Sequence, residues 1–290
     1  MNKKAQAHIL LTVVSIIYGA NYVIIKLVSP QFMGPSGLVL IRTLMAVLFF
    51  WLVGMFTKKQ KIDKEDWSRI FLCAVVGAAF NQWSFFQGAV NTSAIDASLI
   101  MTSNPIIVLL FASVLLKEKI TKNKVIGIGL GCIGAAFIIM QKDGNGKASS
   151  LYGNGMIFLN SILFGLYLVI VKPLITKYDT ITLMKWIFSF GLLMLIPFGY
   201  EEMMEVKWEN FTEEAWWAFI YSSAGVTFLG YVPNIFALRL VSSSLVSSYL
   251  YVQPILAVAL AYYFFGELIS PAGILAAIMI FIGVYLVGRE

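Results

Sequence analysis

The chain has 290 residues, of which 59% are hydrophobic and 12% are charged, and its mean hydropathy is +0.84. Soluble domains carry about 25% charged residues, so this chain has too few charges to cover a surface that faces water. The composition excludes a soluble domain and predicts an all-α integral membrane protein. The net charge of +6 does not indicate nucleic-acid binding, because the basic residues lie in short loops between apolar runs.

Ten apolar runs are each about long enough to cross a bilayer, which takes roughly 20 residues in a helix. In chain order they are 7–27, 35–57, 67–89, 94–116, 122–141, 152–174, 179–199, 214–237, 242–266 and 271–288. Because unpaired backbone amides are not tolerated in lipid, we expect each run to be helical. The first run follows Lys3 and Lys4, as in a signal peptide, but it lacks a small-residue cleavage site and is expected to be retained.

The distribution of Lys and Arg predicts the orientation of these spans. If the N-terminus is cytoplasmic, fifteen basic residues fall in cytoplasmic segments and four in outer segments. This asymmetry predicts that both termini are cytoplasmic and that the acidic loop 200–217 lies outside. The expected location is therefore the cell membrane, that is, a plasma or inner membrane.

Two stretches of the chain, separated by 149 residues, share an unusual pattern. "ASLIMTSNPIIVLLFASVLLKEKIT" (97–121) and "VSSYLYVQPILAVALAYYFFGELIS" (246–270) carry Ser, Pro-Ile, Ala, Glu and Ile at the same positions. An amide precedes the proline in both, Asn104 in one and Gln253 in the other. The chain therefore looks duplicated, as two halves, 1–145 and 146–290.

Each half holds five predicted spans. Because five is odd, the second half must insert upside down relative to the first. The sequence thus predicts ten transmembrane helices as two five-helix inverted repeats, an arrangement in which a site near the midplane can face either side in turn.

The two prolines predict bends at corresponding places. A proline inside a helix removes one backbone hydrogen bond and kinks the helix. We expect Asn104 and Gln253, which precede the prolines, to face each other across a cavity near the bilayer midplane and to offer their amides to a substrate. The alternative is that each amide pairs with a neighbouring helix.

Taken in order, several features together resemble the EamA family of the drug/metabolite transporter superfamily. They are the two five-span halves, the Gly-x-Asn of Gly19–Asn21, Arg42 in the second span, the stretch 237–270 and the closing "IGVYLVGR". The resemblance covers essentially the whole chain. It implies ten helices in an inverted repeat and export or facilitated movement of small metabolites such as amino acids. It also implies a cavity surrounded by spans 1, 3, 4, 6, 8 and 9, with spans 5 and 10 peripheral.

Aromatic and amide residues in these spans are the candidate substrate-binding residues. They are Tyr18, Asn21, Asn81, Trp83, Asn104, Tyr167, Tyr231, Asn234, Tyr249 and Gln253. A surface of this kind, poor in charge, suits a neutral or zwitterionic molecule. Tyrosines near helix ends are often interfacial anchors instead. We therefore expect about half of a longer list, which adds Tyr22, Gln82, Gln87, Asn160 and Tyr251, to line the cavity.

Charged residues in or near the spans are the candidate gating residues. Arg42 lies inside the second span, and because buried charge is usually paired, Asp96 or helix-end carbonyls are its candidate partners. The alternative is an arginine that packs helices together or snorkels outward. Lys26 and Lys172 occupy repeat-related positions and can be matched gates or snorkelling anchors. The carboxylates that end spans 4 and 9, Glu118 and Glu267, are interpreted as bonding nearby backbone amides.

The sequence predicts no cofactor and no metal site. "GLGCIG" (129–134) matches a dinucleotide-binding motif in letters only, because it lies inside an apolar span and not between a strand and a helix. No carboxylate is expected in mid-membrane, so either transport runs down a gradient or its coupling uses another group.

The expected partners are a small-molecule substrate and the lipid bilayer, not nucleic acid; a homodimer stays open.

Two alternatives to a metabolite transporter of neutral or zwitterionic molecules stay open. A carrier of phosphorylated metabolites would need paired Lys or Arg in the cavity. An integral-membrane transferase would need a convergent set of His, Asp, Glu or Cys near an interface, which the sequence does not display.

Overall fold

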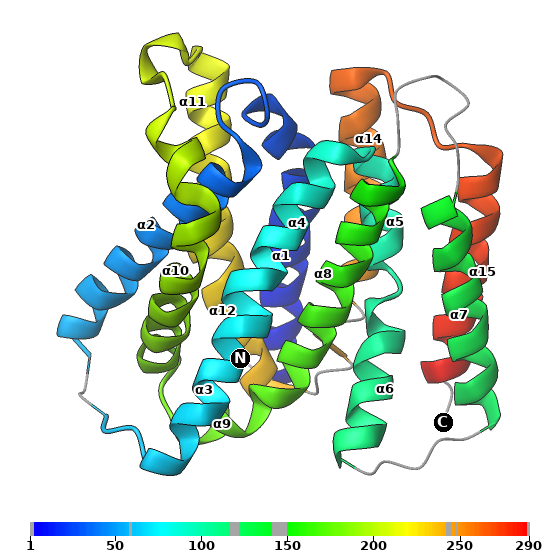
Figure 1. Ribbon diagram of the computed structural model, residues 1–290. Helices are drawn as coiled ribbons and strands as arrows, with labels where there is room; N and C mark the ends of the chain where they lie inside the picture. Colours follow the sequence, from blue (N-terminus) through cyan, green and yellow to red (C-terminus); the bar gives the residue numbers. More distant parts are fainter. Residues whose placement is uncertain are drawn as a thin grey trace.

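The computed structural model describes residues 3–57, 60–116, 122–140, 150–241, 245–246 and 249–288. Every regular element in these residues is helical (Figure 1). Six of the described helical runs are long and apolar enough to cross a bilayer: Ala5–Leu27, Pro35–Met55, Lys64–Asn91, Ala94–Leu115, Leu151–Lys177 and Thr180–Met204. The fold is therefore that of an all-α, multi-pass membrane protein.

The helices of the first half lie within the first five predicted runs to within a few residues. They are α1 (Lys3–Ile24) with a 3-10 extension (Ile25–Leu27), α2 (Pro35–Met55), a 3-10 turn (Lys64–Asp66), α3 (Trp67–Cys73), a π-helical segment (Ala74–Ala79), α4 (Phe80–Asn91), α5 (Ala94–Met101), α6 (Asn104–Leu116) and α7 (Lys122–Met140).

The helices of the second half lie within the remaining runs. They are α8 (Leu151–Ile170), α9 (Lys172–Lys177), α10 (Thr180–Met204), a 3-10 turn (Trp208–Asn210), α11 (Glu213–Ile220), a second π-helical segment (Tyr221–Tyr231), α12 (Val232–Leu240), a 3-10 turn (Tyr249–Val252), α14 (Gln253–Phe265) and α15 (Pro271–Gly288). The predicted runs 122–141, 242–266 and 271–288 hold shorter apolar helices, and 214–237 is divided among three elements. The arrangement as ten spans in two inverted repeats stays a prediction.

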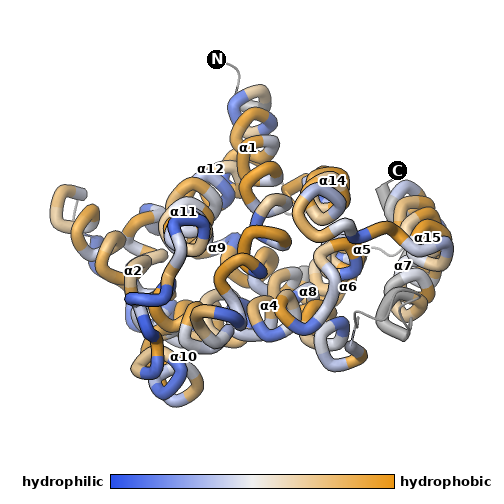
Figure 2. The backbone as a smooth tube through the Cα atoms, turned by 90° about the horizontal axis from the view of Figure 1, so that it is seen from above, coloured by the Kyte–Doolittle hydropathy of each residue, from blue (hydrophilic) through white to orange (hydrophobic). Residues whose placement is uncertain are grey.

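The outer surface of the helices is apolar, as a lipid-facing surface must be. Large apolar side chains such as Leu48, Trp217 and Tyr263 are exposed, the last by 79%. A protein in water rarely exposes apolar patches of this size, whereas the hydrocarbon core of a membrane is a favourable environment for them. Seen from above, orange hydrophobic stretches recur along the helices between blue hydrophilic ones (Figure 2).

The helices form a central group with a pair at each side (Figures 1 and 2). α2 packs against α10 at one side, and α7 packs against α15 at the other, while α1, α4, α8 and α14 lie between. Glycines allow the α7–α15 approach, since a Cβ on Gly283 would lie 3.0 Å from the backbone nitrogen of Gly131. The small residues of "GLGCIG" thus pack helices together, as the sequence predicted.

The two prolines break their spans instead of kinking continuous helices, which corrects the prediction. α6 begins at Asn104 after a turn at Thr102 and Ser103, and α14 begins at Gln253 after a 3-10 turn. Each proline is therefore the second residue of a new helix. There its missing N–H has no effect, because the first turn of a helix has no intrahelical acceptor in any case.

Two π-helical segments interrupt the third and eighth predicted runs, and no sequence pattern foretold them. The segment Ala74–Ala79 lies just before Asn81 and Gln82, and the segment Tyr221–Tyr231 ends at Tyr231. These three side chains line the central cavity that is described below. A π turn inserts an extra residue and rotates the helix that follows it. The two segments therefore set which side chains of α4 and α12 face the centre of the molecule.

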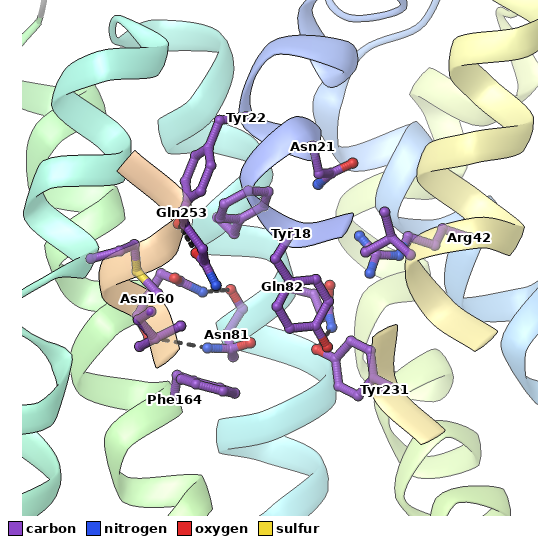
Figure 3. Close-up of a pocket in the computed structure, with 14 residues that line it drawn as sticks. Tyr18, Asn21, Tyr22, Arg42, Asn81, Gln82, Asn160, Phe164, Tyr231 and Gln253 are labelled. Carbon is purple, nitrogen blue, oxygen red and sulfur yellow. Dashed lines mark hydrogen bonds between the residues drawn. The ribbon is translucent and has the colours of Figure 1, made fainter. Parts of the chain in front are cut away.

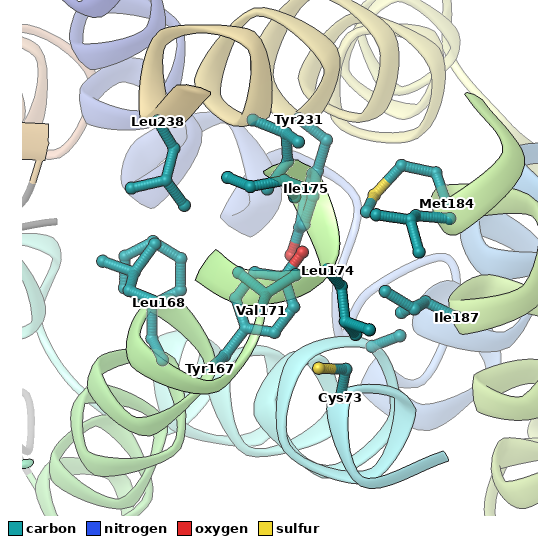
Figure 4. Packing of buried hydrophobic residues seen from close by; sticks show 14 of the residues in the cluster. Cys73, Tyr167, Leu168, Val171, Leu174, Ile175, Met184, Ile187, Tyr231 and Leu238 are labelled. Atoms are coloured by element: carbon teal, nitrogen blue, oxygen red, sulfur yellow. The ribbon is translucent and has the colours of Figure 1, made fainter. Parts of the chain in front are cut away.

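A buried apolar cluster fills the space near the end of α3 and the end of α8 (Figure 4). Cys73 and Tyr167 lie in this cluster beside aliphatic residues of α8, α9 and α10. Cys73 is a free thiol that packs as a small core residue, and Cys132 of α7 is also free. The cluster joins the two halves of the chain at this end.

Polar contacts close the same end of the molecule, where the spans begin and end. Lys177 Nζ lies 2.5 Å from Asp63 Oδ2 and 2.6 Å from Asp66 Oδ2, and Tyr178 donates to Asp66 at 2.6 Å. These contacts tie the segment before α3 to the segment after α9.

We expect Asp63→Asn to lower the thermal stability at neutral pH and to have little effect in acid. The hydrogen bond from Lys177 holds the pKa of Asp63 below its ordinary value. The stabilisation is thus fully present above the unfolded pKa of about 3.9 and is lost as pH falls through the lower folded pKa. The effect is small because the Asp63 side chain is 58% exposed. Unfolding temperatures measured from neutral pH into acid check this, with exposed Glu65→Gln as control. A wild-type-to-variant difference that does not change with pH would contradict it.

Candidate functional site

A cavity of about 70 Å³ lies at the centre of the helix bundle (Figure 3). Its lining comes from α1, α2, α4, α5, α8, the second π-helical segment, the 3-10 turn before α14, and α14. The lining residues are Tyr18, Asn21, Tyr22, Arg42, Asn81, Gln82, Phe85, Met101, Asn160, Phe164, Val226, Tyr231, Leu250 and Gln253. These residues belong to the six spans that the resemblance implied, with Arg42 added from the second span.

Asn81 and Asn160 join two walls of the cavity. Asn81 Nδ2 donates to the backbone carbonyl of Asn160 at 3.0 Å, and Asn160 Nδ2 donates to the carbonyl of Asn81 at 2.8 Å. This reciprocal pair fixes α4 against α8. The Oδ1 atom of Asn160 is buried and has no hydrogen-bond partner among the described residues, so an acceptor is left over at this wall.

Tyr22 and Gln253 join α1 to α14 on another side. The Tyr22 hydroxyl donates to Gln253 Oε1 at 3.1 Å, and Gln253 Nε2 has no acceptor among the described residues. The helices meet closely here because Gly19 has no side chain: a Cβ at this position would lie 3.1 Å from Gln253 Cα. The glycine of the Gly-x-Asn element thus positions Gln253, while Asn21 accepts a hydrogen bond from Ser222 at 3.0 Å.

Gln82, Tyr231 and Tyr18 form a third polar group in the cavity. Gln82 Nε2 donates to the Tyr231 hydroxyl, and the Tyr231 ring meets the Tyr18 ring edge-on at 6.3 Å between centroids. A Cβ on Gly230 would lie 3.1 Å from Cζ of Tyr18. The glycine therefore leaves room for the Tyr18 ring.

Arg42 lies in the cavity wall without the predicted acidic partner. Its Nε donates to Thr227 Oγ1 at 3.0 Å, and its guanidinium carbon lies 5.2 Å from the centroid of the Phe86 ring. Asp96 is located elsewhere, in the first turn of α5, where its N–H is capped by Ser93. The expectation that Arg42 pairs with Asp96 is wrong, because α5 begins at a different place around the cavity.

A second cavity of about 10 Å³ adjoins the first on the side of the N-terminal part of α1. It shares Tyr18, Phe164, Leu250 and Gln253 with the first cavity. Asn234 and Tyr249 line this space and not the central one, and the Tyr249 hydroxyl bonds His8 Nδ1. The two predicted residues therefore mark an extension of the cavity toward the end of the molecule that carries the N-terminus.

Three predicted residues lie outside both cavities. Asn104 Nδ2 donates to the Ser161 carbonyl at 2.8 Å, and Trp83 Nε1 donates to Ser36 Oγ at 3.2 Å. Tyr167 lies in the apolar cluster, and within the described part of the chain its hydroxyl has no hydrogen-bond partner. These side chains join helices to one another, which for Asn104 is the alternative that the sequence left open.

Lys26 and Lys172 lie at opposite ends of the bundle and make different contacts. Lys26 Nζ lies 3.4 Å from Glu267 Oε1, and Glu267 Oε2 accepts from the Ala94 N–H at 3.2 Å. Lys172 donates to the carbonyls of Leu238, in the last turn of α12, and Val241, just after it, where a cation complements the helix C-terminus. Glu118 lies outside the described residues.

The sequence missed the apolar part of the lining. Phe85, Met101, Phe164, Val226 and Leu250 line the cavity. Helical spacing could have found two of them, because Phe85 lies four residues after Asn81 and Phe164 lies four residues after Asn160, on the same helix faces. A mixed aromatic, amide and apolar surface of this kind suits a small organic molecule.

Comparison with known proteins identifies the family of this chain. Residues 5–140 and 151–289 each match the EamA-like transporter family. An "Uncharacterized transporter" of Archaeoglobus fulgidus is 25% identical over 99% of this chain and 98% of its own length. The "Uncharacterized transporter YyaM" of Bacillus subtilis is 25% identical over 97% of this chain and 93% of its own.

Two further likenesses concern a named substrate and the fold. A "Probable terminal-alkyne amino-acid exporter" of Streptantibioticus cattleyicolor is 24% identical over 89% of this chain and 85% of its own. A solved crystal structure has a TM-score of 0.66 at 14% identity and covers 98% of this chain and 96% of that one, which shows a shared fold. Because the family match extends over nearly the whole sequence, this chain belongs to the EamA-like transporter family.

Proposed function

We propose that this membrane transporter carries small organic metabolites, with amino acids and similar neutral or zwitterionic molecules as the class to test first. The buried central cavity carries the proposal. Polar side chains are costly inside a membrane, and here amides and phenols from five predicted spans converge on one space. The relative named as an amino-acid exporter supports the same class.

We further propose alternating access as the mechanism. In this proposal residues 1–145 and 146–290 are inverted repeats, and both termini are cytoplasmic. Contacts at the two ends of the bundle, Lys26 with Glu267 and Lys177 with Asp63, would then open in turn. The same proposal places the chain in the cell membrane and leaves open whether it works as a monomer or a homodimer.

A carrier of phosphorylated metabolites is less well matched. Such a substrate was expected to need paired basic side chains, and the lining residues include one, Arg42. A phosphate dianion would therefore keep a net negative charge in the cavity. Relatives named as transporters likewise give no support to a transferase.

Binding to the purified protein tests the substrate class. Because a ligand that binds only the folded state raises its stability, an amino acid at about 100 times its Kd should add about 2.7 kcal/mol. A metabolite panel read by thermal unfolding should show stabilisation by a subset of amino acids. Stabilisation by sugar phosphates and by no amino acid would favour the phosphorylated-metabolite alternative.

We expect flux in vesicles to proceed down a substrate gradient without an imposed pH difference. Among the described residues, no carboxylate lines the two cavities, so these walls offer no acidic group there for a proton relay. The measurement is substrate efflux from vesicles with equal pH on both sides. Flux that appears only when a pH difference is applied would overturn this, and Asp96 would be the first residue to examine.

A further inference from the structure

Arg42 is a buried cation with unused hydrogen-bond donors. Only 4% of the surface of Arg42 is exposed. Guanidinium has five N–H donors, and in the described part of the chain one of them, on Nε, has an acceptor, Thr227. The four N–H groups on the two terminal nitrogens have none, and no ion pair involves Arg42 among these residues.

The unused donors face the central cavity. Arg42 lines this space, and Figure 3 shows its guanidinium directed from α2 toward Tyr18 and Gln82. Tyr18 and Tyr231 line the same cavity as Arg42. The Tyr231 oxygen accepts from Gln82, so its own O–H is free to donate into the same space.

The charge of the cavity wall is unbalanced. Arg42 is the charged residue of the lining, and the other members are amides, phenols and apolar side chains. A buried charge is usually paired, because leaving it alone in an apolar surrounding is costly. The wall therefore lacks one anion, and a guanidinium with neighbouring phenols is a set of donors that matches a carboxylate.

We propose that the cavity recognises its substrate through a single carboxylate, which binds the terminal nitrogens of Arg42. This inference rests on the proposed function and narrows it to monocarboxylates, amino acids included, with the carboxylate as the required group. An amine has no acidic partner in the lining, so it contributes less to recognition. A dianionic phosphate is disfavoured, because one arginine does not neutralise it.

Reactivity of Arg42 in the purified full-length protein gives a first test that does not depend on the natural substrate. The small uncharged reagent 2,3-butanedione should modify Arg42, read by peptide mass spectrometry. Acetate should slow the modification and acetamide, its uncharged analogue, should not. Exposed Arg69 is the internal control, and its modification should be the same with both additives.

Three results would overturn the proposal. Arg42 that does not react is closed off from the cavity. Equal protection by acetate and acetamide means that the carboxylate charge is not recognised. Equal protection of Arg42 and Arg69 by acetate means an effect of salt and not of a site.

Variants of Arg42 give a second test through matched probes. The carboxylate 4-methylpentanoate should stabilise the wild-type protein against heat, and 4-methylpentanamide should do so much less. Loss of a charge-assisted hydrogen bond should weaken carboxylate binding by about tenfold or more in Arg42→Gln. The affinity of Arg42→Lys for the carboxylate should lie between those of the wild type and Arg42→Gln. Lysine keeps the positive charge but not the planar guanidinium that can donate two parallel hydrogen bonds. If Arg42→Gln binds the carboxylate as wild type does, the proposal is wrong.

The outcomes separate this proposal from the proposed function. Protection of Arg42 by acetate without transport of any amino acid would reject the function and keep the anion site. Transport of amino acids without protection would keep the function and reject the anion site. If Arg42→Gln fails to fold, the reactivity test on the wild-type protein still decides.

Discussion

Gln253→Leu is expected to reduce transport by about tenfold while the protein still folds, whereas Asn104→Leu should lower stability with little change in transport per folded molecule. Gln253 is 2% exposed and lines the cavity, and its Nε2 has no acceptor in the described residues. Asn104 uses its Nδ2 to bond the Ser161 carbonyl outside the cavity. Leucine at 253 removes both a group that can bind substrate and the Tyr22 hydrogen bond between α1 and α14, whereas leucine at 104 removes only a helix-to-helix bond.

The two leucine variants control for each other, because the substitutions are alike and the residues correspond in the two halves. Vesicle flux normalised to folded protein, together with thermal unfolding, separates the effects. Equal losses of transport in both variants would show that the cavity does not distinguish the two amides. An undiminished flux in Gln253→Leu would remove this residue from the site.

The largest loss of stability is expected for Gly199→Ala, at the contact of α10 with α2. A Cβ there would lie 2.9 Å from the carbonyl carbon of Ser36 and 2.8 Å from Leu40 Cβ. Ser36 contributes backbone, which cannot rotate away, so the two helices must separate. Overpacking of this kind costs about 1–3 kcal/mol.

Gly155→Ala is the matched control for this change. Gly155 lies in α8, and nothing lies within 4 Å of its Cβ position. Alanine there should raise stability slightly, by up to about 1 kcal/mol, because it favours the helix. Thermal unfolding of both variants in the same detergent is the measurement. Equal behaviour of the two alanines would mean that α2 and α10 are not in close contact.

The sequence predicted the class of fold because the relevant forces are local to each span. Apolar runs of sufficient length, such as 35–57, must form helices in lipid whatever lies beside them. The same reasoning found small residues at the α7–α15 contact, where Gly131 approaches Gly283. These features can be predicted without knowing which helices are neighbours in the fold.

The site was predictable only in part, because lining a cavity depends on rotation about each helix axis. Asn104 and Gln253 have the same local pattern, an amide before a proline, yet only Gln253 faces the cavity. Trp83 comes directly after Asn81 and Gln82 in the sequence, yet its indole lies outside the cavity and donates a hydrogen bond to Ser36. The π-helical segment Ala74–Ala79 changes that rotation, and its sequence carries no signal for it.

Arg42 shows the same limit for charges. Its burial could be anticipated from its place within an apolar run, but its partner could not. The predicted partner, Asp96, lies at the start of α5, and Thr227 and Phe86 take its place. A contact between residues 185 positions apart in the chain follows from tertiary packing alone.

Counterflow in vesicles tests the central claim most directly. Purified protein is placed in vesicles that are loaded with an unlabelled amino acid, and entry of the same labelled amino acid is followed with no ion gradient. A transporter with one central cavity predicts transient accumulation of label in wild-type vesicles, about tenfold less in Gln253→Leu vesicles, and none in empty vesicles. No accumulation for any amino acid that binds the purified protein would contradict transport through this cavity.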